Sequence, residues 1–322
     1  MRLIIAILFF SLNLPASVIG QTDTVVTRRT DDAPTVNRKG TITQWIGDSL
    51  TINLKGVERE IDNDSIVKIE TQWGVNYKLG VQELNSGNLS FAIVQFEEAL
   101  TNENRPWAKL IIHALLIDAY QSTEKYADAI RHFESLLRKD PQTRFLPLAP
   151  ICWTGSGTVM TSVTRRLENS QNPFLQLIAA SWMLTSPQRN TGIEILQMLS
   201  EDIDPRIKNI AIAQLWRTRL NVTDKQVKPW EKIIVGLPRE FRAGPYLVLA
   251  EAQSRVGQTQ PAIANLMRIP ILFPDQKSLV AAALYRTGKL LDNQGEPDLA
   301  QPILNELVTL YPQTLWAKQI DQ

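Results

Sequence analysis

One stretch of this 322-residue chain holds residue types that could do chemistry: Cys152-Trp-Thr-Gly-Ser-Gly-Thr158. A thiolate is a strong nucleophile, and the backbone amides of a glycine-rich turn can cradle a phosphate. The nucleophile would need a histidine close by, and the phosphate loop a lysine after its glycines; neither is near in the sequence. The pattern therefore favours a linker with a half-buried thiol, and an enzyme centred on Cys152 is the lesser alternative.

The chain has only two histidines, His113 and His132. Neither has a cysteine, a second histidine or a carboxylate at ligand spacing on its own helical face. We therefore predict no metal site, no cofactor and no catalytic residue.

The first twenty residues have the pattern of an export signal. Arg2 is the only charge, residues 3–14 form an apolar run, and the small residues of 18–20 offer a peptidase site before Gln21. Because a membrane span needs about 20 apolar residues, the run is too short for one. The sequence predicts a signal peptide over 1–20 and no transmembrane segment after cleavage, with a retained anchor as the alternative.

Charge and cysteine content restrict the compartment and the partners. Without Arg2 the formal net charge falls from +1 to zero (1 − 1 = 0), which argues against a nucleic-acid partner. Cys152 is the only cysteine, so it has no internal disulfide partner. Export without disulfides favours the periplasm or cell envelope of a bacterium.

After a polar linker over 21–39, residues 40–72 change to a two-residue period. Leu50, Ile52 and Leu54 alternate with polar residues, which is typical of strands with one buried face. Four or five short strands separated by turn residues predict a small all-β domain that resembles an SH3-like or Sm-like barrel.

This β domain offers an alternative function, the binding of RNA or glycans through Trp45 and Trp73. From residue 21 to 73 there are seven basic and nine acidic residues, a balance of −2 (7 − 9 = −2). That sign opposes contact with phosphate, so packing or docking of a protein is favoured for both tryptophans.

Helical spacing begins at Trp73, and one pattern recurs at a fixed interval. Residues from Ala250 to Pro274 are matched 38 positions later by residues from Gly288 to Pro312 (288 − 250 = 38). Such periodicity predicts stacked helical hairpins. A small residue such as Ala92 lets two helices approach, and Gly87 makes the turn between them.

Four segments resemble tetratricopeptide repeats: roughly 73–106, 110–141, 243–274 and 281–312. The resemblance implies a mainly α fold, a right-handed superhelix of hairpins, with repeats 1 and 2 in 73–141 and repeats 3 and 4 in 243–322. It is closest to the repeats of bacterial cell-envelope proteins. Glu83 departs from the pattern, since an aromatic residue is usual there.

Residues 142–242 are helical without clean repeat spacing, and we interpret them as degenerate repeats; a separate globular unit is the alternative. Asn172-Pro173, Ser186-Pro187 and Asp204-Pro205 each place a capping residue before proline, which predicts three helix starts. Thr223 and Gln226 have the spacing of a capping box.

In tetratricopeptide arrays the first helix of each hairpin lines a groove, and the resemblance implies which residues point into it. Those positions are Tyr77, Val81, Leu84, Asp118, Gln121, Glu251, Ser254, Arg255, Tyr285, Lys289, Asp292 and Asn293. The prediction is a non-enzymatic exported scaffold that holds a protein or peptide partner of unknown identity. Exposed terminal repeats also predict self-association as a further alternative.

Overall fold

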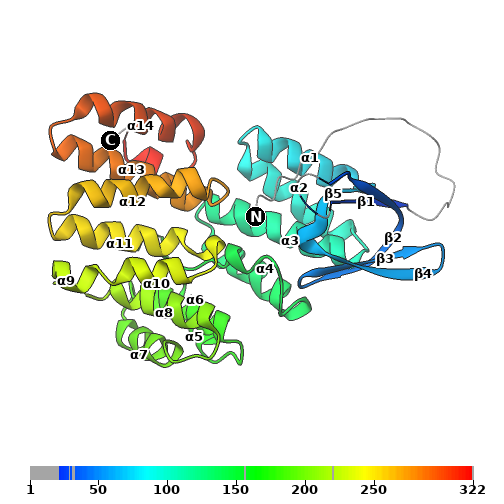
Figure 1. Ribbon diagram of the computed structural model, residues 1–322, viewed down its shortest axis with the longest axis horizontal. Coiled ribbons are helices and arrows are strands. Elements are labelled where there is room, and N and C mark those ends of the chain that lie inside the picture. The colour runs from blue at the N-terminus through cyan, green and yellow to red at the C-terminus, as the bar shows by residue number, and fades with distance from the viewer. Residues whose placement is uncertain (1–21, 29, 31–32, 156, 220, 321–322) are drawn as a thin grey trace. The chain divides into compact units, whose positions relative to one another are not determined.

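The computed structural model describes residues 22–28, 30, 33–155, 157–219 and 221–320. The predicted signal peptide and Gln21 lie outside these residues. The described residues form two compact units (Figure 1), the first within 22–116 and 135–146 and the second within 117–134 and 147–320. The predicted boundary at 72/73 is therefore not a division between compact units. Within the described residues, no helix combines the length and apolar character that a membrane crossing requires.

The first unit contains a five-stranded antiparallel sheet. Its strands are β1 (Asp23–Thr27), β2 (Val36–Ile46), β3 (Ser49–Leu54), β4 (Val57–Asp62) and β5 (Ile66–Glu70). They lie in the order β4-β3-β2-β1-β5, so the first strand pairs with both β2 and the last strand. A short 3-10 turn (Asn63–Ser65) precedes β5. The sequence predicted the β domain correctly.

The prediction of a linker over 21–39 is wrong for two parts of that range. Strand β1 and the first residues of β2 lie there, paired from Asp23 with Gly40 to Thr27 with Val36. The core residue Val25 is completely buried. Threonines occupy two other positions of this short strand, so apolar and polar residues do not alternate clearly in the sequence. Pairing with β2 and β5 stabilises this strand, and pairing with distant residues is not visible in local composition.

Aromatic side chains join the sheet to the helices within the first unit. The rings of Trp45 on β2 and Trp107 on α3 (Pro106–Ser122) have centroids 6.3 Å apart, and Trp73 meets Trp107 edge to face at 5.8 Å. The Gly47 amide, after β2, donates to both carboxylate oxygens of Asp140 at 3.1 and 3.0 Å. The sheet and these helical segments therefore share one core.

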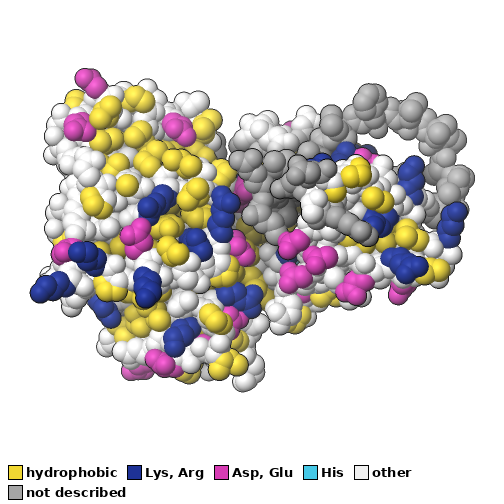
Figure 2. All heavy atoms as spheres, viewed as in Figure 1, with side chains coloured by type: hydrophobic (Ala, Val, Ile, Leu, Met, Phe, Trp, Pro, Cys, Tyr) yellow, Lys and Arg dark blue, Asp and Glu magenta, His cyan; other side chains and the backbone are white. Residues whose placement is uncertain are grey.

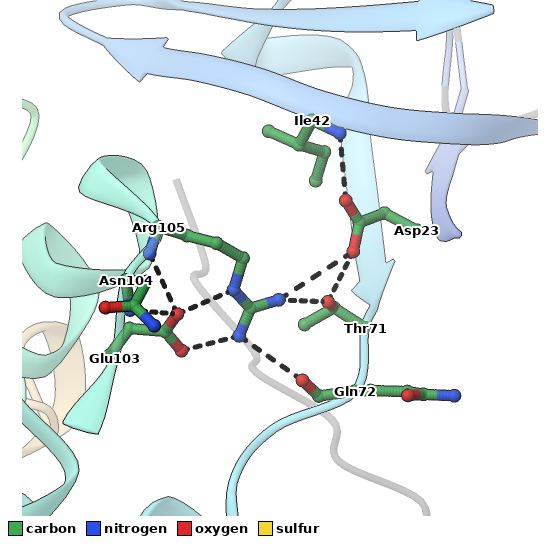
Figure 3. A network of polar contacts seen from close by, with 7 residues as sticks. All are labelled: Asp23, Ile42, Thr71, Gln72, Glu103, Asn104 and Arg105. Atoms are coloured by element: carbon green, nitrogen blue, oxygen red, sulfur yellow. Dashed lines mark hydrogen bonds and ion pairs between the residues drawn. The ribbon is translucent and has the colours of Figure 1, made fainter. Parts of the chain in front are cut away.

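Arg105 lies at the centre of a polar network beside these aromatics (Figure 3). Its guanidinium stacks between Trp73 and Trp107, with centroid distances of 5.1 and 5.0 Å. It donates to Glu103 Oε2 at 2.6 Å and to Thr71 Oγ1 at 2.7 Å. Because this charged group is largely buried, these contacts replace its lost hydration.

Four helical hairpins match the predicted repeats. They are α1 (Val75–Asn85) with α2 (Leu89–Asn102), α3 with α4 (Tyr126–Lys139), α11 (Ala243–Arg255) with α12 (Thr259–Leu272), and α13 (Lys277–Asn293) with α14 (Pro297–Leu310). The last four lie side by side in chain order (Figure 1). Helices α3 and α4 each contribute residues to both units.

The turn inside each hairpin has the same backbone form. Three residues link the two helices, and the middle one has a positive φ: 81° at Gly87, 78° at Gly257, 77° at Gly295 and 61° at Glu124. Glycine adopts this region without steric cost, which explains three of the four residues. Glu124 is an exception with a contact of its own, since its Oε1 accepts from the Leu315 amide at 2.7 Å.

The middle helices belong to the second unit, so the alternative of a separate globular unit for 142–242 is wrong. They are α5 (Thr161–Glu168), α6 (Pro173–Met183), α7 (Arg189–Leu199), α8 (Pro205–Trp216), α9 (Asp224–Val227) and α10 (Trp230–Gly236). Consecutive helices α5 to α8 pack together, and α8 and α10 contact α11. A short helix, α15 (Leu315–Lys318), packs against α13 and α14.

Two of the predicted helix starts in this region are confirmed. Asn172 accepts from the Phe174 amide and Asp204 from the Arg206 amide, each one residue before the proline that begins α6 or α8. The start predicted at Ser186-Pro187 is two residues early, because the Ser186 hydroxyl accepts from the Gln188 amide and α7 begins at Arg189.

Candidate functional site

The predicted groove residues of the first repeat lie mainly inside the first unit. Tyr77 is 4% exposed and stacks on Trp73 at 3.7 Å, and Val81 is also buried. Burial raises the pKa of the Tyr77 hydroxyl, against the opposing charge of Arg105. Both residues are therefore core residues, and their assignment to an open groove is wrong. Leu84 is half-buried.

Asp118 and Gln121, from the second repeat, line a cavity of about 60 Å³ in the second unit. Gln121 Nε2 donates to the Leu148 carbonyl at 2.9 Å, and Asp118 Oδ2 lies 4.0 Å from Lys277 Nζ. Burial raises the pKa of Asp118, and Lys277 opposes that rise. These two residues thus face a small cavity with a mixed polar and apolar lining, which they share with the segment 147–154.

The third and fourth repeats bring several predicted groove residues together in the second unit. Glu251 on α11 accepts from Arg255 Nη2 at 2.6 Å and from Arg286 Nη1 at 3.4 Å. Arg286, on α13, was not predicted as a groove residue. These ion pairs link α11 to α13. The surface around them, which we call the α11–α13 surface, is formed by Glu251, Ser254, Arg255, Tyr285, Arg286, Lys289, Asp292, Asn293 and Trp316.

Aromatic rings continue the α11–α13 surface toward the C-terminal end. Tyr285 and Trp316 have ring centroids 5.3 Å apart, and the Arg286 guanidinium lies 5.7 Å from the Trp316 ring. Lys289 Nζ is 5.7 Å from the Tyr285 ring. A cation over an aromatic face is attracted by the ring quadrupole, so these side chains hold one another in place.

The remaining predicted residues lie on the same two helices. Ser254 is half-buried on α11, and Asp292 and Asn293 are exposed at the end of α13. The predicted groove residues that are exposed are therefore Arg255, Lys289, Asp292 and Asn293. Their role in binding stays a prediction.

The segment Pro150–Thr154 lies across four helices of the second unit, and every second carbonyl is held by a side chain. The Pro150 carbonyl accepts from Trp182 Nε1 at 2.9 Å, and the Thr154 carbonyl from Arg286 Nη2 at 3.4 Å. Between them, the Cys152 carbonyl accepts from Gln214 Nε2 at 3.1 Å and Arg217 Nη1 at 2.6 Å. The chain thus covers part of its own helical surface with an extended segment.

Trp153 anchors this segment on α11. It is buried, and a Cβ built on Gly244 would lie 2.1 Å from its ring, so glycine is required there. The segment that was predicted to be a linker is therefore packed against the helices. Its thiol was predicted to be half-buried, and it is buried.

Cys152 is buried and lies beside an arginine. Its amide donates to Ser181 Oγ at 3.0 Å, and its sulfur lies 3.6 Å from Arg217 Nη2. His113 and His132 are both buried, and His132 stacks on Tyr120 at 5.4 Å. Among the described residues, no group of three His, Cys, Asp or Glu side chains could hold a metal ion.

The tryptophans of the β domain serve packing. Trp45 and Trp73 are half-buried against Trp107, Trp45 Nε1 donates to Asn63 Oδ1 at 2.5 Å, and the Arg144 guanidinium covers the Trp45 ring at 3.5 Å. Both rings thus contact protein neighbours, as the favoured packing role expects.

Comparison with known proteins identifies one repeat directly. Residues 282–314 match the family model of the tetratricopeptide repeat. No curated protein matches the chain. Among solved structures, the chain is similar to the crystal structure of PilW, a widely conserved type IV pilus biogenesis factor, at 15% identity and a TM-score of 0.33. That match covers 77% of this chain and 97% of PilW, and it is too weak to indicate a shared function.

The chain therefore contains a tetratricopeptide repeat in α13 and α14, within an array of helical hairpins that follows a small β domain. Stacked helical repeats present extended surfaces to other proteins. The class that the fold defines is a helical-repeat architecture with a small β domain.

Proposed function

We propose that this chain is an exported, non-enzymatic scaffold of a bacterial cell envelope, and that it binds a segment of a partner protein on the α11–α13 surface. The observation that carries the proposal is the tetratricopeptide repeat at 282–314, whose first helix α13 bears the exposed residues Lys289, Asp292 and Asn293.

The α11–α13 surface holds the predicted groove residues that are exposed. Tyr77 and Val81 are buried, and Asp118 and Gln121 border a small cavity. The segment Pro150–Thr154 covers the neighbouring surface of α6 and α8. Arg255 and Lys289 are exposed, beside the half-buried rings of Tyr285 and Trp316. Charged groups around half-buried aromatics are typical of protein-binding surfaces.

The proposed export depends on the pattern of residues 1–20. Its test is expression of the full chain in a bacterium, followed by fractionation and mass determination of the recovered protein. Recovery from the envelope fraction as a chain beginning near Gln21 supports export, whereas intact protein in the cytoplasm contradicts it.

The binding proposal is tested by affinity capture from an envelope extract with residues 21–322. The variant is Lys289→Glu with Asp292→Lys, which keeps the net charge and reverses the charge pattern on α13. A matched control reverses two exposed residues elsewhere in the second unit, Lys232→Glu on α10 with Asp298→Lys on α14.

A protein that is recovered by the wild type and by the control, and lost with the variant, supports the proposal. Recovery of the same proteins with all three chains would show that α13 is not the binding surface.

A further inference from the structure

The α11–α13 surface carries more positive than negative charge. Arg255 and Arg286 share one carboxylate, that of Glu251, and Arg217 is close enough to Arg286 to affect its ionisation. Arg255, Arg286 and Lys289 face Glu251 and Asp292 on this surface, which leaves a local balance of +1 (3 − 2 = 1). Figure 2 shows Lys and Arg side chains (dark blue) across the middle of the helical unit, with Asp and Glu side chains (magenta) among them.

Arg286 is less hydrated than Arg255, whose side chain is 41% exposed. The Arg286 side chain is 20% exposed, and its contact with Glu251 at 3.4 Å is longer than the 2.6 Å contact that Arg255 makes. Burial lowers the pKa of Arg286, Glu251 opposes that change, and Arg217 and Arg255 lower it further. A second carboxylate at this position would offset the repulsion among the guanidinium groups.

The neighbouring residues define how such a carboxylate would be held. Arg255 is exposed and planar, and a guanidinium can donate two parallel hydrogen bonds to one carboxylate. Lys289, one helical turn beyond Tyr285, adds an exposed ammonium group. Tyr285 and Trp316 supply apolar walls between these charges.

The segment Pro150–Thr154 limits where a ligand fits. Its Thr154 carbonyl already takes one hydrogen bond from Arg286 Nη2, so this side of the guanidinium is occupied by the chain itself. The other terminal nitrogen, Nη1, donates to Glu251. A ligand carboxylate would therefore share Arg286 with these two partners, whereas Arg255 and Lys289 are exposed.

We propose that the partner segment held by the α11–α13 surface is acidic, and that its carboxylates pair with Arg255, Arg286 and Lys289. This inference rests on the proposed function and names the chemistry of the partner. An acidic protein segment fits better than a nucleic acid, because the cationic group is compact and the whole chain has a formal net charge of only +1.

The test measures binding of labelled ten-residue peptides to residues 21–322 by fluorescence anisotropy. One peptide alternates glutamate with glycine, a second alternates lysine with glycine, and a thymidine decanucleotide is the third probe. We expect the glutamate peptide to bind most tightly, with an affinity that falls as salt is added.

Two arginines provide a matched pair of variants. The Arg255 and Arg268 side chains are both 41% exposed, and each pairs with one glutamate, at 2.6 and 2.8 Å. Arg255→Glu should weaken binding of the glutamate peptide about tenfold or more, whereas Arg268→Glu on α12 should leave it unchanged. Lys289→Gln, at an exposed position, should also weaken binding of the glutamate peptide. This second variant keeps the inference testable if Arg255→Glu does not fold.

Equal binding of the lysine peptide, an equal loss with Arg268→Glu, or tighter binding of the oligonucleotide would overturn the inference. The outcome is separable from the proposed function. If envelope proteins are still captured through Lys289 and Asp292 while the peptides show no preference for negative charge, the scaffold stands and the acidic partner does not.

Discussion

Arg105 shows how a single charged side chain can be accommodated between a sheet and a helix. It contacts Glu103 and Thr71, its Nη2 donates to the Gln72 carbonyl at 3.3 Å, and its Nη1 lies 3.9 Å from Asp23 Oδ1. Asp23 in turn accepts from the Ile42 amide at 2.8 Å (Figure 3). The network therefore connects β1, β2, the end of β5 and the start of α3.

Glu103 makes the stability of the first unit depend on pH. Burial alone would raise the pKa of Glu103, but its hydrogen bonds and ion pair with Arg105 outweigh burial and lower it. A carboxyl group with a folded pKa below its unfolded value of about 4.3 stabilises the fold above that pH. That contribution is lost as the pH falls through the folded pKa.

Glu103→Gln should therefore lower the free energy of unfolding of the first unit at pH 7 by about 1–3 kcal/mol and flatten its dependence on pH below about 5. Hydrogen exchange of the β1 amides between pH 3 and pH 7 would measure both effects. Glu60→Gln, at an exposed position on β4, is the control and should behave like the wild type. An unchanged pH dependence in Glu103→Gln would contradict this account.

At the scale of helices, the close approach of α13 and α14 depends on Gly288. A Cβ at this position would lie 2.3 Å from Leu304 Cδ2 and 2.6 Å from Leu304 Cγ. Alanine favours a helix by about 1 kcal/mol over glycine, but overpacking typically costs about 1–3 kcal/mol. We expect Gly288→Ala to lower the melting temperature.

Gly236→Ala is the matched control for this prediction. Gly236 ends α10, and a Cβ there would meet nothing within 4 Å. The substitution should be neutral or stabilise the helix by a few tenths to about 1 kcal/mol. If calorimetry found both variants equally stable, the contact between Gly288 and Leu304 would not limit the approach of the two helices.

The packed segment Pro150–Thr154 leads to a second prediction at this scale. Trp153→Ala would remove a buried ring from α11 and should cost about 3–5 kcal/mol, measured by denaturant unfolding. Met160→Ala is a control of similar position in the chain, since Met160 is 67% exposed and should contribute little. A loss of less than about 1 kcal/mol for Trp153→Ala would mean that the segment is not anchored by this ring.

At the scale of the whole molecule, the first unit is assembled from residues far apart in the chain. Gly47 bonds to Asp140, 93 residues away, and the Arg144 guanidinium covers Trp45. A fragment of residues 22–72 would lose these partners and expose Trp45. We expect it to remain largely unfolded, whereas residues 22–146 should fold.

Circular dichroism and the dispersion of amide signals in NMR spectra of the two fragments would test this expectation. Cooperative unfolding of 22–72 by itself would show that the β strands form an independent domain. Failure of 22–146, which includes residues 117–134 of the second unit, to fold would show instead that the first unit also needs residues beyond 146.

The sequence by itself determined the hairpins, because the contacts within a hairpin are local. Ala92 and Phe96 pack against the preceding helix, and the glycines at 87, 257 and 295 turn the chain between helices. These interactions join residues within about 40 positions, so their spacing appears directly in the sequence. The β domain was predicted for the same reason, through the alternation of β3.

Only the tertiary structure decided which of the predicted groove residues stay accessible. Strand β1 depends on pairing with residues up to 46 positions away (70 − 24 = 46), and Arg286 reaches the Thr154 carbonyl across 132 positions. Periodicity identifies the face of a helix but not the segment that covers it. Burial of Tyr77 and the placement of Pro150–Thr154 follow from contacts between distant segments, which no local pattern encodes.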